Sequence, residues 1–156
     1  MIKNLLNQFK FRTEKNSKPT KHLICDDVKT NRLILKKYLN MVGCEVDEAD
    51  DGIEALIKVK NNFYDIIWMD IKMPKMDGHC CTEILRNKMN YQGIIIGLTG
   101  YNDDLTIKKC ICIGMNDVVA KPFDKNIIWM HIQQISNSEN SENNNLARVS
   151  DSPVII

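Results

Sequence analysis

Residues 64–70 read Tyr-Asp-Ile-Ile-Trp-Met-Asp, an apolar run that ends on an acidic residue. Four consecutive apolar positions precede Asp70, a pattern typical of a strand that is buried on both faces of a parallel sheet. Such sheets bind ligands at the carboxyl ends of their strands. The stretch therefore predicts a central strand that delivers the Asp70 carboxylate to the functional edge of a sheet.

The alternation of strand and helix continues outward from this segment in both directions. Strands are expected at residues 22–26, 44–48, 64–70, 93–99 and 117–121, and helices near residues 28–41, 51–60, 77–88, 103–112 and 124–135. In the first helix, Leu35, Tyr38, Leu39 and Val42 share one face. Five successive β-α units predict the α/β class, with a doubly wound, five-stranded parallel sheet covered by helices on both faces.

The composition of the chain is typical of one globular domain with polar ends. The 156 residues are 44% apolar and 26% charged. We expect a basic N-terminal leader and linker over residues 1–20, a folded domain over residues 21–135, and an Asn/Ser-rich disordered tail over residues 136–156.

Several classes of protein are disfavoured by the same composition. No apolar run approaches the length of a membrane span, and the start of the chain lacks a secretory signal, so we expect a cytoplasmic protein whose six cysteines are thiols. The cysteines form no Cys-x-x-Cys pair, so a zinc site is not expected. The net charge of +1 gives no general reason to expect contact with nucleic acid.

Polar side chains end four of the five predicted strands. They are Asp26 and Asp27 after the first strand, Asp70 after the third, Thr99 after the fourth and Lys121 after the fifth. Two carboxylates about 4 Å apart repel each other by about 4 kcal/mol at an effective dielectric constant of about 20. Mg²⁺ would remove this repulsion, because it prefers oxygen ligands and retains several waters.

This set of residues suits phosphoryl transfer to a carboxylate. A cation is needed to screen an anionic phosphoryl donor from an anionic nucleophile such as Asp70. Lys121 could pair with Asp70 and then with a phosphoryl oxygen, while the Thr99 hydroxyl donates to another oxygen. Each residue alone has a plain structural explanation, such as helix capping, but their shared placement at one sheet edge favours a site.

The sequence resembles the receiver domains of two-component signalling, the CheY-like family, over roughly residues 21–135. The resemblance rests on Ile24-Cys25-Asp26-Asp27, Asn31-Arg32, residues 51–56 (DGIEAL), residues 69–78 (MDIKMPKMDG), Leu98-Thr99-Gly100, residues 114–117 (GMND) and Lys121-Pro122-Phe123. It implies a flavodoxin-like strand order of 2-1-3-4-5 and a cis bond between Lys121 and Pro122.

The resemblance also implies a role for each site residue. Asp70 would be the phosphoacceptor, Asp27 and Asp70 would bind Mg²⁺ directly, Asp26 would act mainly through water, and the Lys72 carbonyl would complete the protein ligands. Thr99 and Lys121 would be the switch pair. Residues 73–78 are similar to those of receivers in hybrid histidine kinases and phosphorelays.

The partners implied are a histidine kinase or histidine-phosphotransfer protein as donor and a downstream protein as target, with no contact to nucleic acid. The domain would not be an enzyme, beyond assisting its own aspartyl phosphorylation and dephosphorylation.

Two alternatives remain open at this point. Many receivers carry an aromatic residue three positions before the fifth-strand lysine, where this chain has Val118. A degenerate receiver that only binds partners is therefore one alternative. A phosphatase of the haloacid dehalogenase type is the other, but its nucleophile follows the first strand and has a second Asp two residues later, whereas Asp70 follows the third strand.

Overall fold

The computed structural model describes residues 19–101 and 103–134. The chain divides into two compact units, one up to Phe123 and one from Asp124 onward, in which residues 125–134 are helical. Almost all of the predicted leader and the whole of the predicted tail lie outside the described residues. The sheet and all predicted site residues belong to the first unit.

The sheet has five parallel strands in the order β2-β1-β3-β4-β5, which confirms the predicted topology. The strands are β1 (Lys21–Cys25), β2 (Glu45–Ala49), β3 (Ile66–Asp70), β4 (Ile94–Thr99) and β5 (Asp117–Ala120). The register pairs Cys25 with Met69, Asp70 with Leu98 and Thr99 with Ala120. The carboxyl ends of β1, β3, β4 and β5 are therefore nearly level, and the residues that end them meet at one edge.

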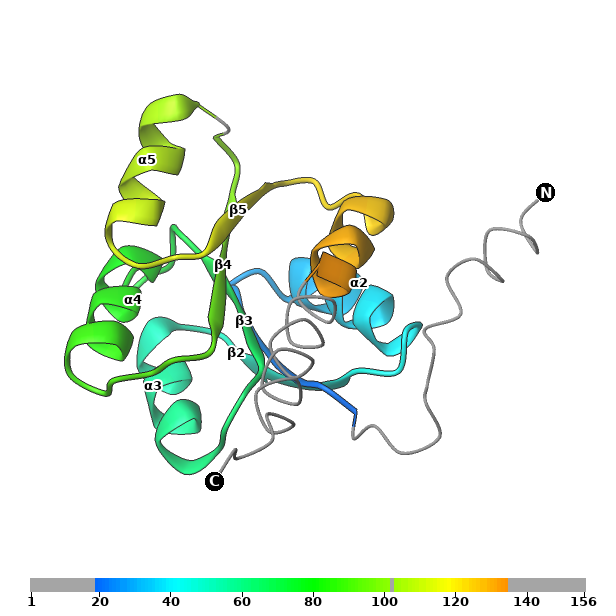
Figure 1. The fold of residues 1–156 in the computed structure, drawn as a ribbon, viewed down its shortest axis with the longest axis horizontal. Helices are drawn as coiled ribbons and strands as arrows, with labels where there is room; N and C mark the ends of the chain where they lie inside the picture. Colours follow the sequence, from blue (N-terminus) through cyan, green and yellow to red (C-terminus); the bar gives the residue numbers. More distant parts are fainter. Residues whose placement is uncertain (1–18, 102, 135–156) are drawn as a thin grey trace, which may run out of the picture. The chain divides into compact units, whose positions relative to one another are not determined.

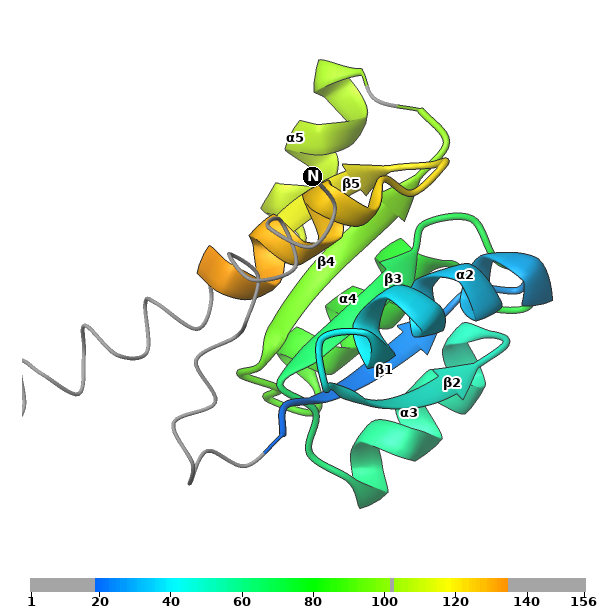
Figure 2. The same ribbon diagram turned by 90° about the vertical axis from the view of Figure 1, so that its right-hand side faces the viewer.

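Helices cover both faces of this sheet. They are α2 (Lys29–Asn40), α3 (Gly52–Asn61), α4 (Gly78–Asn87) and α5 (Asp104–Cys112). Figure 1 looks along the sheet, with α2 on one side and α3, α4 and α5 on the other, and Figure 2 shows α2 crossing β1 and β3. The predicted bounds of these elements agree with the observed ones to within two residues.

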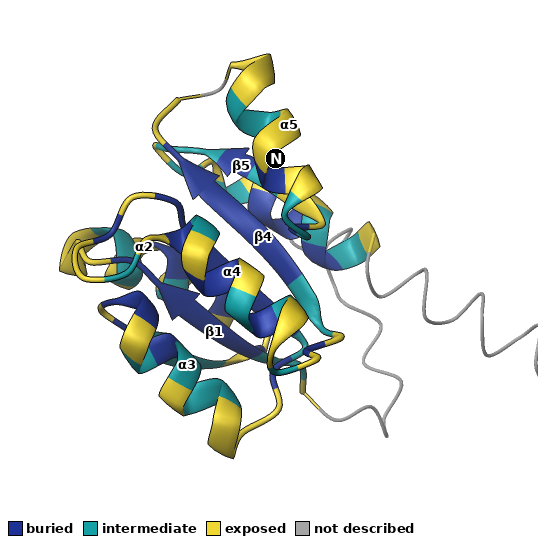
Figure 3. Ribbon diagram, turned by 90° about the vertical axis from the view of Figure 1, so that its left-hand side faces the viewer, coloured by how far each residue is buried: buried dark blue, intermediate teal, exposed yellow. Residues whose placement is uncertain are grey.

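The core lies between the sheet and these helices. All five residues of β3 are buried, as the apolar run predicted. Leu23, Ile67 and Met69 face α3 and α4 in one hydrophobic cluster with Ala55 and Leu85. Figure 3 shows β1 and β4 as mostly buried and the outer faces of the helices as exposed, whereas the edge strands β2 and β5 are only partly buried. The strands therefore form a rigid base for the residues at their ends.

Acidic residues start three of the helices. Asp51, Asp77 and Asp103 each accept a hydrogen bond from a backbone N–H three residues later, at 2.8, 2.8 and 2.9 Å. A capping carboxylate satisfies one of the free N–H groups in the first turn of a helix. These acids therefore have a structural role, which separates them from the acids at the strand ends.

The six cysteines all lie in the part of the chain that the structure describes. All six cysteines are free thiols, and Cys25, Cys44, Cys81 and Cys110 are buried. Among the helices that the structure describes, none has the length and apolar character needed to cross a membrane.

Candidate functional site

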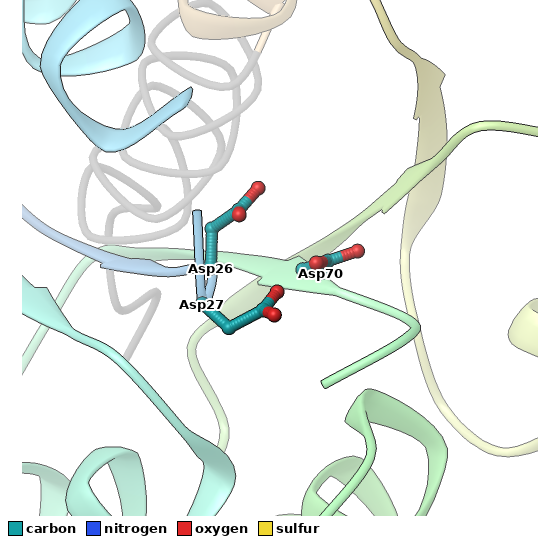
Figure 4. Close-up of side chains that lie close together, drawn as sticks. All are labelled: Asp26, Asp27 and Asp70. Carbon is teal, nitrogen blue, oxygen red and sulfur yellow. The ribbon is translucent and has the colours of Figure 1, made fainter. Parts of the chain in front are cut away.

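Three carboxylates meet at the carboxyl edge of the sheet. Asp26 and Asp27 directly follow β1, and Asp70 is the last residue of β3. Carboxylate oxygens, one from each residue, lie within 4.8 Å of one another. Figure 4 shows the three side chains close together at the ends of the two neighbouring strands. The sequence prediction that these acids gather at one edge agrees with this geometry.

The Asp26 carboxylate is completely buried and has several donors. Its Oδ1 accepts the Val28 N–H at 2.8 Å, and the Asn31 amide nitrogen lies 3.2 and 3.1 Å from Oδ1 and Oδ2. The Lys121 Nζ lies 2.7 Å from Oδ2. Because protein donors already occupy both oxygens, Asp26 is poorly placed to bind a cation directly.

Asp27 and Asp70 are less fully paired. Asp27 is exposed, and within the described residues its carboxylate has no hydrogen-bond partner. Asp70 is 5% exposed, and its Oδ1 accepts the Lys72 N–H at 3.3 Å and contacts the Lys121 Nζ at 3.0 Å. Both contacts use Oδ1, so within the described part of the chain Oδ2 remains available. These two acids can therefore offer free oxygens.

The electrostatics of the site follow from burial and crowding. Burial raises the pKa of Asp70 from its ordinary 3.8 to about 6, against the opposing charge of Lys121, and the charge of Asp26 adds to the rise. Burial alone would lower the pKa of Lys121, but its hydrogen bonds and charge interactions with Asp26 and Asp70 raise it overall. Lys121 is thus an ammonium group shared by two acids.

Thr99 ends β4, but its hydroxyl is bonded within its own loop. It donates to the Tyr101 carbonyl at 2.9 Å and accepts the Tyr101 N–H at 3.0 Å. The Lys72 Nζ lies 4.3 Å from the centre of the exposed Tyr101 ring. Of the predicted set, Lys121 therefore joins the acids, whereas the hydroxyl of Thr99 is engaged with Tyr101.

Residues 23–133 match the family model described as response regulator receiver domain. This chain belongs to the response regulator receiver domain family. It is 42% identical over 113 residues to the sensor protein EvgS of Escherichia coli strain K12, and 37% identical over 118 residues to the osmosensing histidine protein kinase SLN1 of Saccharomyces cerevisiae. Each match covers 72% of this chain but only 9% and 10% of the relatives, so the chain spans about a tenth of their length.

A solved receiver has the same fold. The receiver domain of the sensor histidine kinase PA1611 of Pseudomonas aeruginosa PAO1 superposes with a TM-score of 0.70 at 30% identity, over 76% of this chain and 99% of that one. That structure has a magnesium ion coordinated in its active site cleft. The family is one of signalling domains rather than classical enzymes, which disfavours the haloacid dehalogenase alternative.

The receiver domain also contains scaffold residues to which the sequence analysis assigned no role. Asn31 stands in a quoted motif, but its contact with Asp26 depends on the first turn of α2 lying over the end of β1. A Cβ on Gly78 would overlap the Asp70 carbonyl oxygen, so only glycine lets α4 begin this close to Asp70. The Lys121–Pro122 bond is cis, as the resemblance implied.

The donor set of this receiver fits a small hard cation. The free groups are carboxylate oxygens, the ligand type that Mg²⁺ prefers, and the exposed position of Asp27 leaves room for bound water. Of the three acids, Asp27 lines an open cavity of about 500 Å³, whose other lining residues are Ile71, Lys72, Met73, Pro74, Asp77, His79 and Lys109. One side of the site is therefore accessible from solvent.

Proposed function

We propose that Asp70 is the phosphoacceptor of this receiver domain and takes a phosphoryl group from a phosphohistidine on a partner protein. The bond between the imidazole nitrogen and phosphorus breaks, a bond from Asp70 to phosphorus forms, and the imidazole leaves with its electron pair. The observation that carries this proposal is the free oxygen of Asp70, beside the free Asp27 carboxylate and the shared Lys121 ammonium.

Mg²⁺ is the cofactor in this proposal. Asp27, Asp70 and the Lys72 carbonyl would hold it directly, and Asp26 would act through bound water, since its own oxygens are occupied. The bound cation would neutralise charge that spreads over the transferring phosphoryl group. Lys121 would then shift from the carboxylates to a phosphoryl oxygen, and the Thr99 hydroxyl would turn from Tyr101 to another.

The proposed partners follow from this chemistry. A histidine kinase or a histidine-phosphotransfer protein supplies the phosphoryl group in the cytoplasm, and the modified domain acts on a downstream protein rather than on nucleic acid. The similarity of this chain to part of a sensor protein and of a histidine protein kinase supports a donor of this class. The domain assists only its own phosphorylation and dephosphorylation.

A mass measurement tests the proposal. The protein is incubated with Mg²⁺ and phosphoramidate, whose nitrogen–phosphorus bond imitates phosphohistidine, and intact masses are compared for wild type, Asp70→Asn and Asp103→Asn. Asp103 is the control, because it is an exposed acid that caps α5 and is not one of the three clustered acids. We expect one phosphoryl group on wild type and on Asp103→Asn, none on Asp70→Asn, and none when EDTA replaces Mg²⁺.

Two results would count against this function. Equal modification of Asp70→Asn would place the acceptor elsewhere. No modification of wild type, despite measurable binding of Mg²⁺, would favour the degenerate receiver that acts only as a binding module.

A further inference from the structure

The loop between β3 and α4 joins Asp70 to the rest of the cation site. Residues 71–77 leave the end of β3, pass through Lys72 and return to α4 at Gly78. The Gly78 N–H donates to the Ile71 carbonyl at 2.9 Å, which closes the base of the loop. Within the loop, the Met76 N–H donates to the Pro74 carbonyl at 2.7 Å, and further contacts join the middle of the loop to α3.

An ion pair fixes that middle portion. The Lys75 Nζ lies 2.5 Å from the Asp51 Oδ2, while the Asp51 Oδ1 caps α3 by accepting the Glu54 N–H at 2.8 Å. The Asp51 side chain is only 7% exposed and its carboxylate is oriented by the helix cap, whereas the Lys75 side chain is 65% exposed. The loop is thus tied to the N-terminus of α3 through one long side chain.

Two backbone features support this connection. Lys75 has a φ of 63°, a left-handed conformation that residues with a side chain adopt infrequently. A Cβ added to Gly52 would lie 2.8 Å from the Met76 carbonyl oxygen, so the first turn of α3 lies directly against the loop. The loop therefore holds a specific backbone shape against a rigid helix end.

We propose that Lys75 and Asp51 are positioning residues for the cation site. Their ion pair holds the loop so that Lys72 and Met73 form the wall of the cavity that Asp27 lines. Neither residue would bind the cation itself. This inference rests on the proposed binding of Mg²⁺ and identifies the ion pair as the contact that preorganises the ligands.

Preorganisation explains how an ion pair that does not bind the cation can change the affinity for Mg²⁺. A ligand group that is already held in place loses less conformational freedom when a cation binds. Without the ion pair, the seven loop residues would sample more conformations, and the Lys72 carbonyl would have to be ordered at the moment of binding. Affinity for Mg²⁺ would therefore fall.

For Lys75, the loss of its charge and the loss of its positioning contact predict opposite changes in the affinity for Mg²⁺. Removing the positive charge of Lys75 makes the acidic edge more negative, which by charge alone would strengthen binding of Mg²⁺. Removing the negative charge of Asp51 would weaken it. Loss of position weakens binding in both cases, so the direction of the change for Lys75→Met separates the two effects.

The experiment is calorimetric titration of Mg²⁺ into the full chain. We expect Kd to rise roughly three- to tenfold in Lys75→Met and in Asp51→Asn, below the effect usual for groups that bond a metal ligand directly. The double variant should equal the larger single variant, because both break one contact. Lys75→Arg should retain most of the wild-type affinity.

Lys58→Met is the matched control. Like Lys75→Met, it removes one positive charge, here from α3. It also breaks an ion pair with Glu54 at 3.5 Å, but that pair does not contact the loop. Its Kd should stay within about twofold of wild type or fall slightly, as charge alone dictates.

Hydrogen exchange supplies a readout that does not need the metal. Amides of residues 71–78 should exchange faster in Lys75→Met and Asp51→Asn than in wild type or Lys58→Met. Tighter binding of Mg²⁺ by Lys75→Met would overturn the proposal, as would unchanged affinity with a loosened loop. The mass comparison of wild type and Asp70→Asn tests the proposed function separately, because both proteins retain the ion pair of Lys75 and Asp51.

Discussion

Replacing Asp70 by Asn should stabilise the metal-free receiver domain at neutral pH. The residue Asp70 is 5% exposed, and burial raises the pKa of its carboxyl group from 3.8 to about 6, so folding destabilises its ionised form. At full weight this rise corresponds to about 3 kcal/mol. Solvent at the open side of the site screens part of this energy, so we discount it to about 1–2 kcal/mol. Asn has nearly the same shape and carries no charge.

The sign of this effect determines its pH dependence. A carboxyl group with a raised pKa favours the folded state below about pH 4, where it is protonated in both states. That contribution is lost as the pH rises through about 6. The free energies of unfolding of wild type and Asp70→Asn should therefore diverge between about pH 4 and pH 6, and the difference should be constant above about pH 7.

Urea unfolding in EDTA at several pH values measures this difference directly, provided that the slope against urea is the same for both proteins. Adding Mg²⁺ should then reduce the advantage of the variant. At ten times its Kd, a ligand that binds only the folded state stabilises it by about 1.4 kcal/mol. Wild type should gain this amount, whereas Asp70→Asn lacks one carboxylate and should gain much less.

Two outcomes would refute the reasoning. If Asp70→Asn were less stable than wild type in EDTA at pH 7, the interaction with Lys121 would outweigh the cost of burial. If the difference did not change between pH 4 and pH 7, the ionisation of Asp70 would not be its cause. Asp103→Asn serves as the control, since its carboxylate caps a helix and has a lowered pKa.

Three further predictions concern His22, Arg86 and Lys121. Burial lowers the pKa of His22 from 6.5 to about 4. The contribution of neutral His22 to the free energy of unfolding should therefore be fully present above about pH 6.5 and fall by up to about 3 kcal/mol as the pH drops through 4. In urea unfolding, His22→Gln should show a flatter dependence on pH. Arg86 donates to three backbone carbonyls at 2.6–2.9 Å and to the Asn116 side chain at 2.8 Å, so Arg86→Met should cost about 2–4 kcal/mol of unfolding free energy in the same assay. Lys121→Met should lower the Kd for Mg²⁺ by roughly tenfold in calorimetry, because it removes a cation that competes for Asp26 and Asp70. Weaker binding by Lys121→Met would instead make Lys121 part of what orders the acids.

The fold could be predicted because local pattern and topology agree throughout the unit. The buried run of β3 identifies a central strand, and helix caps such as Asp51 and Asp77 follow the strands at the expected spacing. The starts of strands were predicted less well. Residues 64 and 65 were assigned to β3, but the Asp65 side chain accepts the Lys21 N–H at 2.7 Å, so this position belongs to the connection before the strand.

The gathering of the acids could be predicted for the same reason, since parallel strands bring their ends to one edge. The direction of each side chain could not. The pattern of polar residues does not encode that the Thr99 hydroxyl bonds to Tyr101, or that Asn31 approaches both oxygens of Asp26. The pair of Lys75 and Asp51 is separated by 24 residues and forms only because α3 and the loop pack together.

If Asp70 is phosphorylated as proposed, Lys121 would connect this modification with movement of the neighbouring loops. One ammonium among three carboxylates leaves negative charge that a divalent cation can balance, and the same ammonium is shared between Asp26 and Asp70 at 2.7 and 3.0 Å. A phosphoryl group on Asp70 would compete for this ammonium and for the Thr99 hydroxyl. If Thr99 leaves Tyr101, the loop after β4 loses two hydrogen bonds at 2.9 and 3.0 Å. Because the Tyr101 ring also contacts Lys72, we expect modification of Asp70 to move the loops after β3 and β4 together.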